Sequence, residues 1–255
     1  MNKIILNGSQ EAKKIFKSLK SKASLVAILI GKDSASQIYI NIKEKRAKEV
    51  GVKFKKHILP SSTSEKKVTD LIEKLNKDKK VNGILIQLPL PKKFNTQKII
   101  EKINPHKDVD GFINTKIIPP TIQSIVHLIK MSKKKIENKK CIILTNSNGF
   151  SKPLEKELKK KKIKVNISLK PKKDNYSKYD VIVIALGKKH WLKPEMIKKG
   201  CIVIDVGINR INKNIYGDVH PGCLNKSKYI SPVPGGVGPL TVAFLFKNLP
   251  RLSKS

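Results

Sequence analysis

Short apolar runs alternate in this chain with longer stretches whose apolar residues recur every three or four positions. Strands that alternate with amphipathic helices in this way are typical of βα units built around a mostly parallel sheet. The first part of the chain predicts strands at residues 25–30, 53–58 and 83–87, separated by helices at about 36–50 and 64–76.

The alternation continues after the proline pair at 119–120, with a helix at about 124–133 and strands at 141–145, 164–168, 181–186 and 201–206. These strands predict a second sheet of the dinucleotide-binding type. We therefore expect an α/β protein of two domains, an N-terminal domain over residues 1–118 and a Rossmann-type domain over residues 119–237. A last helix that begins near Gly238 is expected to return to the first domain, so that residues 238–255 complete it.

The length of 255 residues and the 39% apolar content are those of a globular protein. The three cysteines, Cys141, Cys201 and Cys223, are widely spaced and have no histidine cluster near them, which favours neither a disulfide framework nor a zinc site. No apolar run approaches the roughly 18 residues that a membrane span needs, and the N-terminus lacks an apolar signal region. We expect a protein of a reducing, cytoplasmic setting with no membrane partner.

The formal net charge of +36 raises the question of nucleic-acid binding. Arg46, Arg210 and Arg251 are the only arginines among 55 basic residues, whereas base and phosphate recognition favours the bidentate arginine fork. The lysines are also spread along the whole chain, as in solvated surfaces. The composition is that of a protein from an AT-rich genome, and we expect no specific nucleic-acid partner.

Three residues of the predicted helix at 36–50 share one face. Ser36, Tyr39 and Lys43 stand three and four positions apart. A lysine beside a tyrosine suggests proton chemistry if burial lowers the pKa of the lysine. The alternative is an ordinary solvated lysine.

Two further polar groups follow predicted strands. Gln87 interrupts an apolar run at the carboxyl end of its strand, where ligands of open α/β sheets bind; alternatively it caps the turn before Pro89. Asp108 and Asp110 flank a valine and precede Gly111. Two acids without histidine argue against a metal site, and a carboxylate that binds a heterocyclic substrate fits better.

Two turns are candidates for ligand contact. Residues 231–242 read SPVPGGVGPLTV, where proline fixes φ and glycine permits close backbone approach, so they predict either a rigid ligand-facing loop or a plain strand-to-helix turn. Residues 141–153 form a strand, a polar turn and a helix start, as a dinucleotide phosphate site requires. The glycine fingerprint GxGxxG is absent, so any βα turn fits equally well.

Six segments, spread in order over nearly the whole chain, carry a further pattern. They are SQIYINIKEKRAKEVGV (36–52), GILIQLPLP (83–91), INPHKDVDGF (103–112), IKKGCIVIDVGINR (197–210), GDV (217–219) and YISPVPGGVGPLTVAFL (229–245). With these segments the chain resembles the bifunctional methylenetetrahydrofolate dehydrogenase/cyclohydrolase family. The resemblance implies oxidation of methylenetetrahydrofolate by hydride transfer to NADP, hydrolysis of the methenyl product to 10-formyltetrahydrofolate for one-carbon metabolism and purine biosynthesis, and a homodimer.

The resemblance also implies roles for single residues. Lys43 is the catalytic lysine, and Gln87 hydrogen-bonds it and helps to hold it neutral. Tyr39 packs beside the folate together with Ser36, and Asp110 binds the pterin ring. The folate cleft is walled by loop residues Pro232, Pro234, Gly235 and Gly236. A methenyl cation beside the lysine favours the free amine, which makes it a base for water attack.

The cofactor residues that the resemblance implies are Thr145, Asn146, Ser147, Ser168, Gly187 and Ile208. The family's G-R-S-x-x-V-G-x-P appears here as TNSNGFSKP at 145–153, so an arginine that can pair with the extra phosphate of NADP is replaced by Asn146. Lys152 or Lys170 could compensate as point charges. We therefore expect NADP, with NAD or no cofactor as alternatives.

Three functions follow from these observations. The first is the bifunctional enzyme. The second is a cyclohydrolase that has lost dehydrogenase activity through its altered nucleotide turn. The third, of another class, is a basic protein that binds RNA or other polyanions on an inherited enzyme fold.

Overall fold

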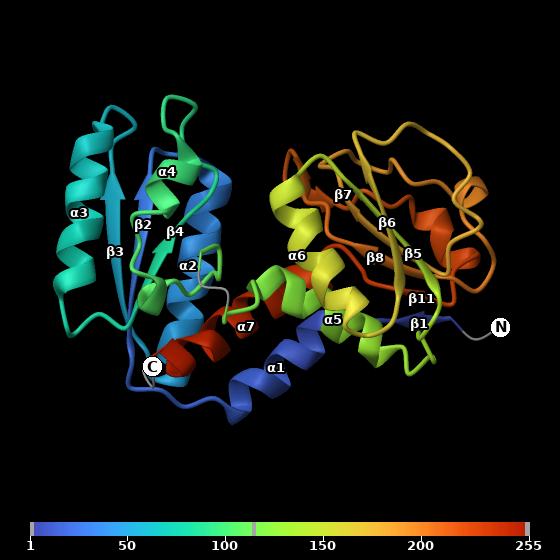
Figure 1. The fold of residues 1–255 in the computed structure, drawn as a ribbon, viewed down its shortest axis with the longest axis horizontal. Helices are drawn as coiled ribbons and strands as arrows, with labels where there is room; N and C mark the ends of the chain where they lie inside the picture. The colour runs from blue at the N-terminus through green and yellow to red at the C-terminus, as the bar shows by residue number, and fades with distance from the viewer. Residues whose placement is uncertain (1–2, 114–115, 253–255) are drawn as a thin grey trace. The chain divides into compact units, whose positions relative to one another are not determined.

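The computed structural model describes residues 3–113 and 116–252, which form two compact units (Figure 1). The three-stranded unit contains Lys13–Pro120 and the chain from Val242 to the end of the last helix. The six-stranded unit contains the N-terminal segment up to Ala12 and Thr121–Thr241. The sheets that give the units their names are parallel throughout, which confirms the predicted α/β fold.

The three-stranded unit has the strand order β3-β2-β4. Its elements are β2 (Ser24–Ile30), α2 (Ser34–Val50), β3 (Lys53–Leu59), α3 (Glu65–Lys77), β4 (Gly83–Ile86), α4 (Thr96–Ile100) and a 3₁₀ turn at Pro105–Lys107. The central strand β2 has an uninterrupted apolar sequence after its first residue and is buried along that length, because central parallel strands are covered on both faces. The strands and helices predicted here are confirmed to within two residues at each end.

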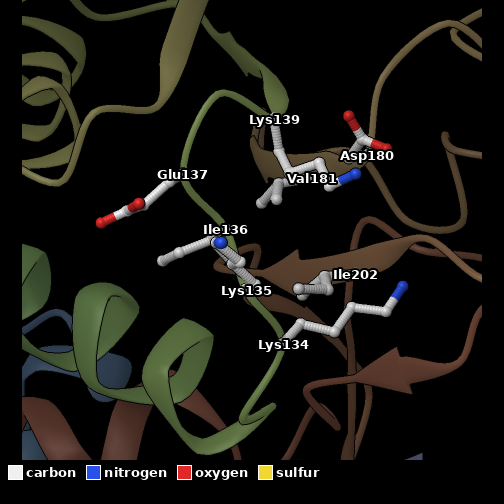
Figure 2. Close-up of a pocket in the computed structure, with 8 residues that line it drawn as sticks. All are labelled: Lys134, Lys135, Ile136, Glu137, Lys139, Asp180, Val181 and Ile202. Atoms are coloured by element: carbon white, nitrogen blue, oxygen red, sulfur yellow. The ribbon is translucent and has the colours of Figure 1, made fainter.

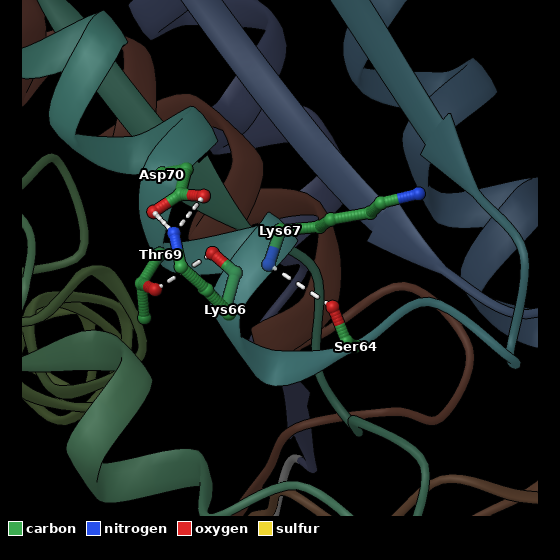
Figure 3. A network of polar contacts seen from close by, with 5 residues as sticks. All are labelled: Ser64, Lys66, Lys67, Thr69 and Asp70. Atoms are coloured by element: carbon green, nitrogen blue, oxygen red, sulfur yellow. Dashed lines mark hydrogen bonds and ion pairs between the residues drawn. The ribbon is translucent and has the colours of Figure 1, made fainter.

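The start of α3 illustrates how local chemistry fixes a helix boundary (Figure 3). The Oγ of Ser64 accepts a hydrogen bond from the N–H of Lys67, which satisfies one of the free donors of the first turn. Lys66 and Asp70 form an ion pair of 2.9 Å one turn apart on the exposed side. Val68, Ile72 and Leu75 form the buried side. The helix therefore packs against the sheet through the face that its apolar periodicity predicts.

The six-stranded unit has the strand order β1-β11-β8-β7-β5-β6. Its strands are β1 (Ile4–Ile5), β5 (Lys140–Thr145), β6 (Lys164–Leu169), β7 (Val181–Ala185), β8 (Ile202–Asp205) and β11 (Tyr229–Ile230). Helices α5 (Pro120–Met131) and α6 (Asn148–Lys159), 3₁₀ turns at Pro194–Met196 and Pro221–Asn225, and a hairpin of β9 (Asn209–Ile211) and β10 (Asn214–Tyr216) complete it. The four predicted strands are confirmed, and they form the centre and one edge of this sheet.

Two helices belong to both units. Helix α1 (Gly8–Ser18) begins in the six-stranded unit, and α7 (Val237–Leu252) begins there and continues into the three-stranded unit at Val242. The N-terminal segment joins the six-stranded unit because β1 pairs with β11. The predicted first domain, residues 1–118, did not anticipate this, since a two-residue strand has no recognisable pattern by itself. The proposed division at 118/119 and 237/238 stays a prediction.

The three cysteines lie in the core of the six-stranded unit. Cys141, Cys201 and Cys223 are all free thiols buried in the six-stranded unit. Burial raises the pKa of the Cys201 thiol to about 11. These residues therefore behave as small core side chains. Within the described ranges, the structure contains no helix with the length and apolar character needed to cross a membrane.

Candidate active site

Lys43 on α2 reaches the carboxyl end of β4. Its Nζ donates a hydrogen bond of 2.9 Å to Oε1 of Gln87. The Nε2 of Gln87 donates at 2.8 Å to the carbonyl oxygen of Leu88, so the amide oxygen faces the lysine. Gln87 is buried directly after β4, at the edge where parallel sheets bind ligands. The structure thus brings two of the predicted catalytic residues into direct contact.

The pKa values of Lys43 and Asp110 are both shifted from their ordinary values. Burial lowers the pKa of the Lys43 ammonium, and the negative charge of Asp110 opposes that shift. Burial raises the pKa of the Asp110 carboxyl to about 7, with Lys43 opposing the shift and Asp108 adding to it. The Gln87 amide carries no charge, so it orients Lys43 without fixing it as the ammonium ion. Such a lysine gives up its proton more readily than an exposed one.

Asp108 has a structural role in the turn that carries Asp110. Its buried carboxylate accepts hydrogen bonds from the N–H groups of Gly111, at 3.0 Å, and Ile113, at 2.8 Å. Gly111 has a φ of 66°, and a Cβ there would lie 2.5 Å from the carbonyl oxygen of Ile117. Only glycine fits such a position. Among the residues that the structure describes, no group of three or more His, Cys, Asp or Glu could hold a metal ion.

Ser36 and Tyr39 lie on α2 before Lys43. The side chain of Asp33 accepts a hydrogen bond of 2.8 Å from the N–H of Ser36, which caps the helix. Ser36 is only 2% exposed, and its buried Oγ has no hydrogen-bond partner among the described residues. Tyr39 is half-buried. Substrate contact by these two residues stays a prediction.

The predicted cofactor residues lie along one edge of the six-stranded sheet. Thr145 ends β5, Ser168 lies next to the end of β6, Gly187 follows β7 and Ile208 follows β8. These strands are parallel neighbours, so their carboxyl ends share an edge. The chain moves from β5 to β6 on one side and then to β7 on the other, which makes the space between β5 and β7 the topological switch point. Dinucleotides bind at such a point in open α/β sheets.

The turn from β5 into α6 lies at this switch point. The Oγ of Ser147 accepts a hydrogen bond from the N–H of Phe150 and caps the helix. The side-chain amide of Asn146 donates at 3.4 Å to the carbonyl oxygen of Leu186, which bridges the ends of β5 and β7. The first N–H groups of a helix have no partner within it and attract phosphate. The turn therefore keeps the geometry of an anion site although it lacks the glycine fingerprint.

Close packing in and beside the loop after β11 leaves no room for a side chain at some of its glycines. A Cβ on Gly236 would lie 2.6 Å from the carbonyl oxygen of Pro232, and a Cβ on Gly8 would overlap the carbonyl group of Gly236. The N–H of Ser9 donates at 2.8 Å to the carbonyl oxygen of Gly235. The loop is therefore held against the start of α1. Because the loop and Lys43 belong to different units, a joint folate site stays a prediction.

Sequence reasoning missed two buried carboxylates of the six-stranded unit, Asp205 and Asp218. Asp218 belongs to the segment GDV at 217–219, which contributed to the family resemblance but was not predicted to form part of a site. The available signal was an acidic residue beside glycine after an apolar strand. Its partners are backbone groups from distant loops, so spacing could not identify them.

A pocket of about 370 Å³ lies at the opposite end of the sheet (Figure 2). It is formed by the segment before β5 and by the amino ends of β7 and β8, with Lys134, Lys139, Asp180, Val181 and Ile202 in its lining. It contains none of the predicted site residues. Lys134 already donates a hydrogen bond of 2.6 Å to the carbonyl oxygen of Gly200, and Asp180 pairs with Lys198 at 2.8 Å.

Comparisons with known proteins agree with this arrangement. Residues 2–110 match the family model of the tetrahydrofolate dehydrogenase/cyclohydrolase catalytic domain, and residues 119–255 match that of its NAD(P)-binding domain. The chain is 38% identical to the bifunctional protein FolD of Campylobacter hominis, over 98% of this chain and 97% of that protein. It is 40% identical to the bifunctional protein FolD of a Sulfurihydrogenibium species, over 98% of each chain.

Solved structures give the same result. The bifunctional FolD methylenetetrahydrofolate dehydrogenase/cyclohydrolase of Campylobacter jejuni superposes with a TM-score of 0.92 at 34% identity, over 98% of both chains. The N5,N10-methylenetetrahydrofolate dehydrogenase-cyclohydrolase of Trypanosoma brucei, complexed with NADP and an inhibitor, superposes with a TM-score of 0.93 at 27% identity. That match covers 100% of this chain and 98% of the other.

Proposed function

This chain belongs to the tetrahydrofolate dehydrogenase/cyclohydrolase family, and on that premise we propose that it oxidises methylenetetrahydrofolate with NADP and hydrolyses the methenyl product to 10-formyltetrahydrofolate. The observation that carries the proposal is the 2.9 Å hydrogen bond between Lys43 and Gln87, at the ligand-binding edge of a parallel sheet. Both reactions act on the same one-carbon bridge of the folate, so one substrate site serves both.

Hydrolysis needs a base for the attacking water. In the methenyl compound the bridging carbon shares a positive charge with its two nitrogens, and that cation disfavours the ammonium form of a neighbouring lysine. Burial already lowers the pKa of Lys43. As the free amine, Lys43 takes a proton from water while the oxygen bonds to the bridging carbon. The bond from that carbon to one nitrogen then breaks as the remaining hydroxyl proton leaves the oxygen, which becomes the formyl oxygen. That nitrogen takes up a proton, so that one proton is released overall.

Oxidation requires positioning and no acid or base at the carbon. When bound, NADP accepts the hydride that leaves the methylene carbon. The residues of this chain fit that group, because the β5–α6 turn ends at a helix N-terminus whose first N–H groups have no partner within the helix, with Ser147 as its N-cap. The end of β6 is followed by Lys170 and carries no acidic residue of the kind that selects NAD through the ribose hydroxyl. These features support NADP over NAD.

The remaining site residues belong to the same proposal. Asp110, with a pKa of about 7, would bind N–H groups of the pterin ring as the carboxylate. Tyr39 and Ser36 would line the folate site, and the loop from Pro232 to Gly236 would cover it. The homodimer and the cytoplasmic location stay predictions.

The purified protein tests the proposal with two assays. Methenyltetrahydrofolate hydrolysis is followed by loss of its absorbance, and oxidation by formation of NADPH or NADH from methylenetetrahydrofolate. The bifunctional enzyme gives both activities, with NADP preferred. Hydrolysis without oxidation by either nucleotide would instead establish the cyclohydrolase alone, an alternative that the replaced arginine and glycines of residues 145–153 favour. Absence of both activities would reject the proposal.

A further inference from the structure

Asp218 is a fully buried carboxylate that binds the ends of two neighbouring strands. Its Oδ2 accepts hydrogen bonds from the N–H groups of Leu186, at 2.6 Å, and Gly187, at 3.1 Å. Its Oδ1 accepts from the N–H of Lys188, at 2.7 Å, and from the side-chain amide of Asn209, at 2.9 Å. The first three donors follow β7, and the fourth follows β8. One side chain therefore connects both segments.

Asp205, the last residue of β8, completes the arrangement from the other side. Its carboxylate accepts hydrogen bonds from the N–H groups of Gly207, at 3.0 Å, Asp218, at 3.0 Å, and Val219, at 2.9 Å. A Cβ on Gly207 would overlap the Asp218 carboxylate, and a Cβ on Gly217 would overlap that of Asp205. Both glycines thus leave room for the acid of the opposite segment. We call Asp205, Gly207, Gly217 and Asp218 the carboxylate clamp.

The segments that the clamp joins lie at the cofactor edge of the sheet. β7 and β8 are on the opposite side of the switch point from β6. A dinucleotide that crosses a switch point has its adenosine half over the first two strands and its other half beyond. Gly187 has a φ of 67° and open space beside its Cα, and Ile208 is 45% exposed. Both positions are therefore accessible to a ligand.

We propose that Asp218 is a positioning residue of the dehydrogenase reaction, which holds the backbone at Gly187 and Ile208 in the shape that receives the nicotinamide half of NADP. The inference rests on the proposed function, since it assumes that these segments face the cofactor. It adds a residue that makes no contact with the cofactor itself.

The chemistry of the clamp requires a carboxylate at position 218. Four donors converge on two oxygens, and an ionised carboxylate is an acceptor at both. Asparagine has nearly the same shape but would turn an NH₂ group toward two of the donors. Buried donors left without an acceptor are costly, so the two segments would move apart.

Two variants and one control test this inference. Asp218→Asn places an NH₂ group opposite two of the donors. Asn209→Ala leaves the carboxylate and removes one of its four hydrogen bonds, together with the 3.3 Å bond from Asn209 to the carbonyl oxygen of Tyr216. Asn214→Ala, at an exposed position of the adjoining hairpin, is the matched control. For each protein, the dissociation constant for NADPH is measured by fluorescence titration, together with the KM for NADP, the rate of methenyltetrahydrofolate hydrolysis without nucleotide, and the melting temperature.

We expect Asn209→Ala to weaken NADPH binding several-fold and Asp218→Asn to weaken it about tenfold or more, the scale of a lost hydrogen bond to a charged group. Hydrolysis should stay within about twofold, and the control should match the parent. If Asp218→Asn does not fold, the change in NADPH binding caused by Asn209→Ala tests the inference by itself. Unchanged NADPH binding in the folded variants would overturn the inference, as would a parallel loss of NADPH binding and hydrolysis. A parent protein that hydrolyses but binds no NADPH would overturn it together with the dehydrogenase half of the proposed function.

Discussion

At the scale of single residues, the partner of Lys43 matters as much as its burial. A carboxylate at hydrogen-bond distance would hold the lysine as an ammonium ion, whereas the Gln87 amide accepts a hydrogen bond from either protonation state. Asp110 supplies a negative charge that partly opposes the lowering of the Lys43 pKa by burial. The site thus combines a fixed orientation with a pKa that the cationic substrate can lower further.

Lys43→Met should reduce methenyltetrahydrofolate hydrolysis by about a hundredfold or more, the usual contribution of a positioned base. Methionine keeps the length of the side chain but has no basic nitrogen. Lys48→Met, at an exposed position of the same helix, should retain the parental rate. Circular dichroism checks that both variants fold. Parental hydrolysis by the Lys43 variant would refute the proposed role.

Gln87→Glu should move the pH dependence of hydrolysis. The reaction needs the free amine, so its rate rises as the pH passes the pKa of Lys43. A carboxylate beside the ammonium raises that pKa, and the rise should therefore shift to higher pH. Gln87→Met removes the hydrogen bond without adding charge, so its profile should show no such upward shift. Equal displacement of both profiles would exclude an electrostatic cause.

Asp110→Asn should change stability in a pH-dependent way. The pKa of Asp110 is about 7 in the folded protein against an ordinary value of 3.8, so the native state holds a proton that the unfolded state has lost between about pH 4 and pH 7. This group's contribution to stability therefore declines as the pH rises through that window.

The variant lacks that titration. Its melting temperature relative to the parent should increase from pH 5 to pH 8, while its folate affinity falls. A difference in melting temperature that does not vary with pH would contradict the raised pKa. Measurement of both proteins in the same buffers separates this effect from the titration of other groups.

At the scale of elements, the loop after β11 shows why glycine content alone is ambiguous. Gly235 has a φ of 108°, a region that favours glycine. Gly236 instead lacks room for a side chain because the carbonyl oxygen of Pro232 lies too close. Gly238 lies on the first turn of α7, and a Cβ there would have none of the described residues' atoms within 4 Å outside its own helical turn. Three glycines of residues 231–242, two in the loop and one in α7, thus differ in what a side chain would meet.

Gly236→Ala and Gly238→Ala form a matched pair. The first substitution should destabilise the protein by about 1–3 kcal/mol, as expected for a side chain forced into a packed site. The second should be neutral or slightly stabilising, since alanine favours helix formation over glycine. Thermal unfolding of both variants measures the difference. Equal melting temperatures would mean that the loop relaxes around the new methyl group.

At the scale of the whole molecule, the charge is unbalanced. With 55 basic and 19 acidic side chains, most lysines cannot have a carboxylate partner. The ion pairs that do form are largely at the surface, as between Lys66 and Asp70, and such pairs add little stability. The excess positive charge therefore opposes the compact state through self-repulsion.

Added salt should consequently stabilise this protein. An increase of NaCl to about 0.5 M reduces the Debye length, the distance over which charges repel one another, to well below the roughly 10 Å of 0.1 M salt. The melting temperature should therefore rise. A protein stabilised mainly by surface ion pairs would show a fall instead. Titration with RNA over the same salt range tests polyanion binding, and tight binding that Lys43→Met leaves unchanged would favour that function over the enzyme.

The sequence by itself predicted most of the fold. Apolar periodicity is a local property, so long elements such as α2 and the buried strand β2 were predicted to within two residues. Two-residue strands such as β1 and β11 were missed, because they exist only through pairing with distant strands, β1 with β11 and β11 with both β1 and β8. The contact of Lys43 with Gln87 was expected from a resemblance and not from spacing.

The sequence determined the residue types available for chemistry, namely a lysine within a helix, an amide after a strand and an aspartate in a turn. Only the tertiary structure decided their electrostatics, because pKa shifts depend on burial and on charges that lie far apart in the chain. The same holds for Asp218, whose donors come from residues 186–188 and 209. Its buried carboxylate is defined by loops that meet only after the parallel sheet has formed.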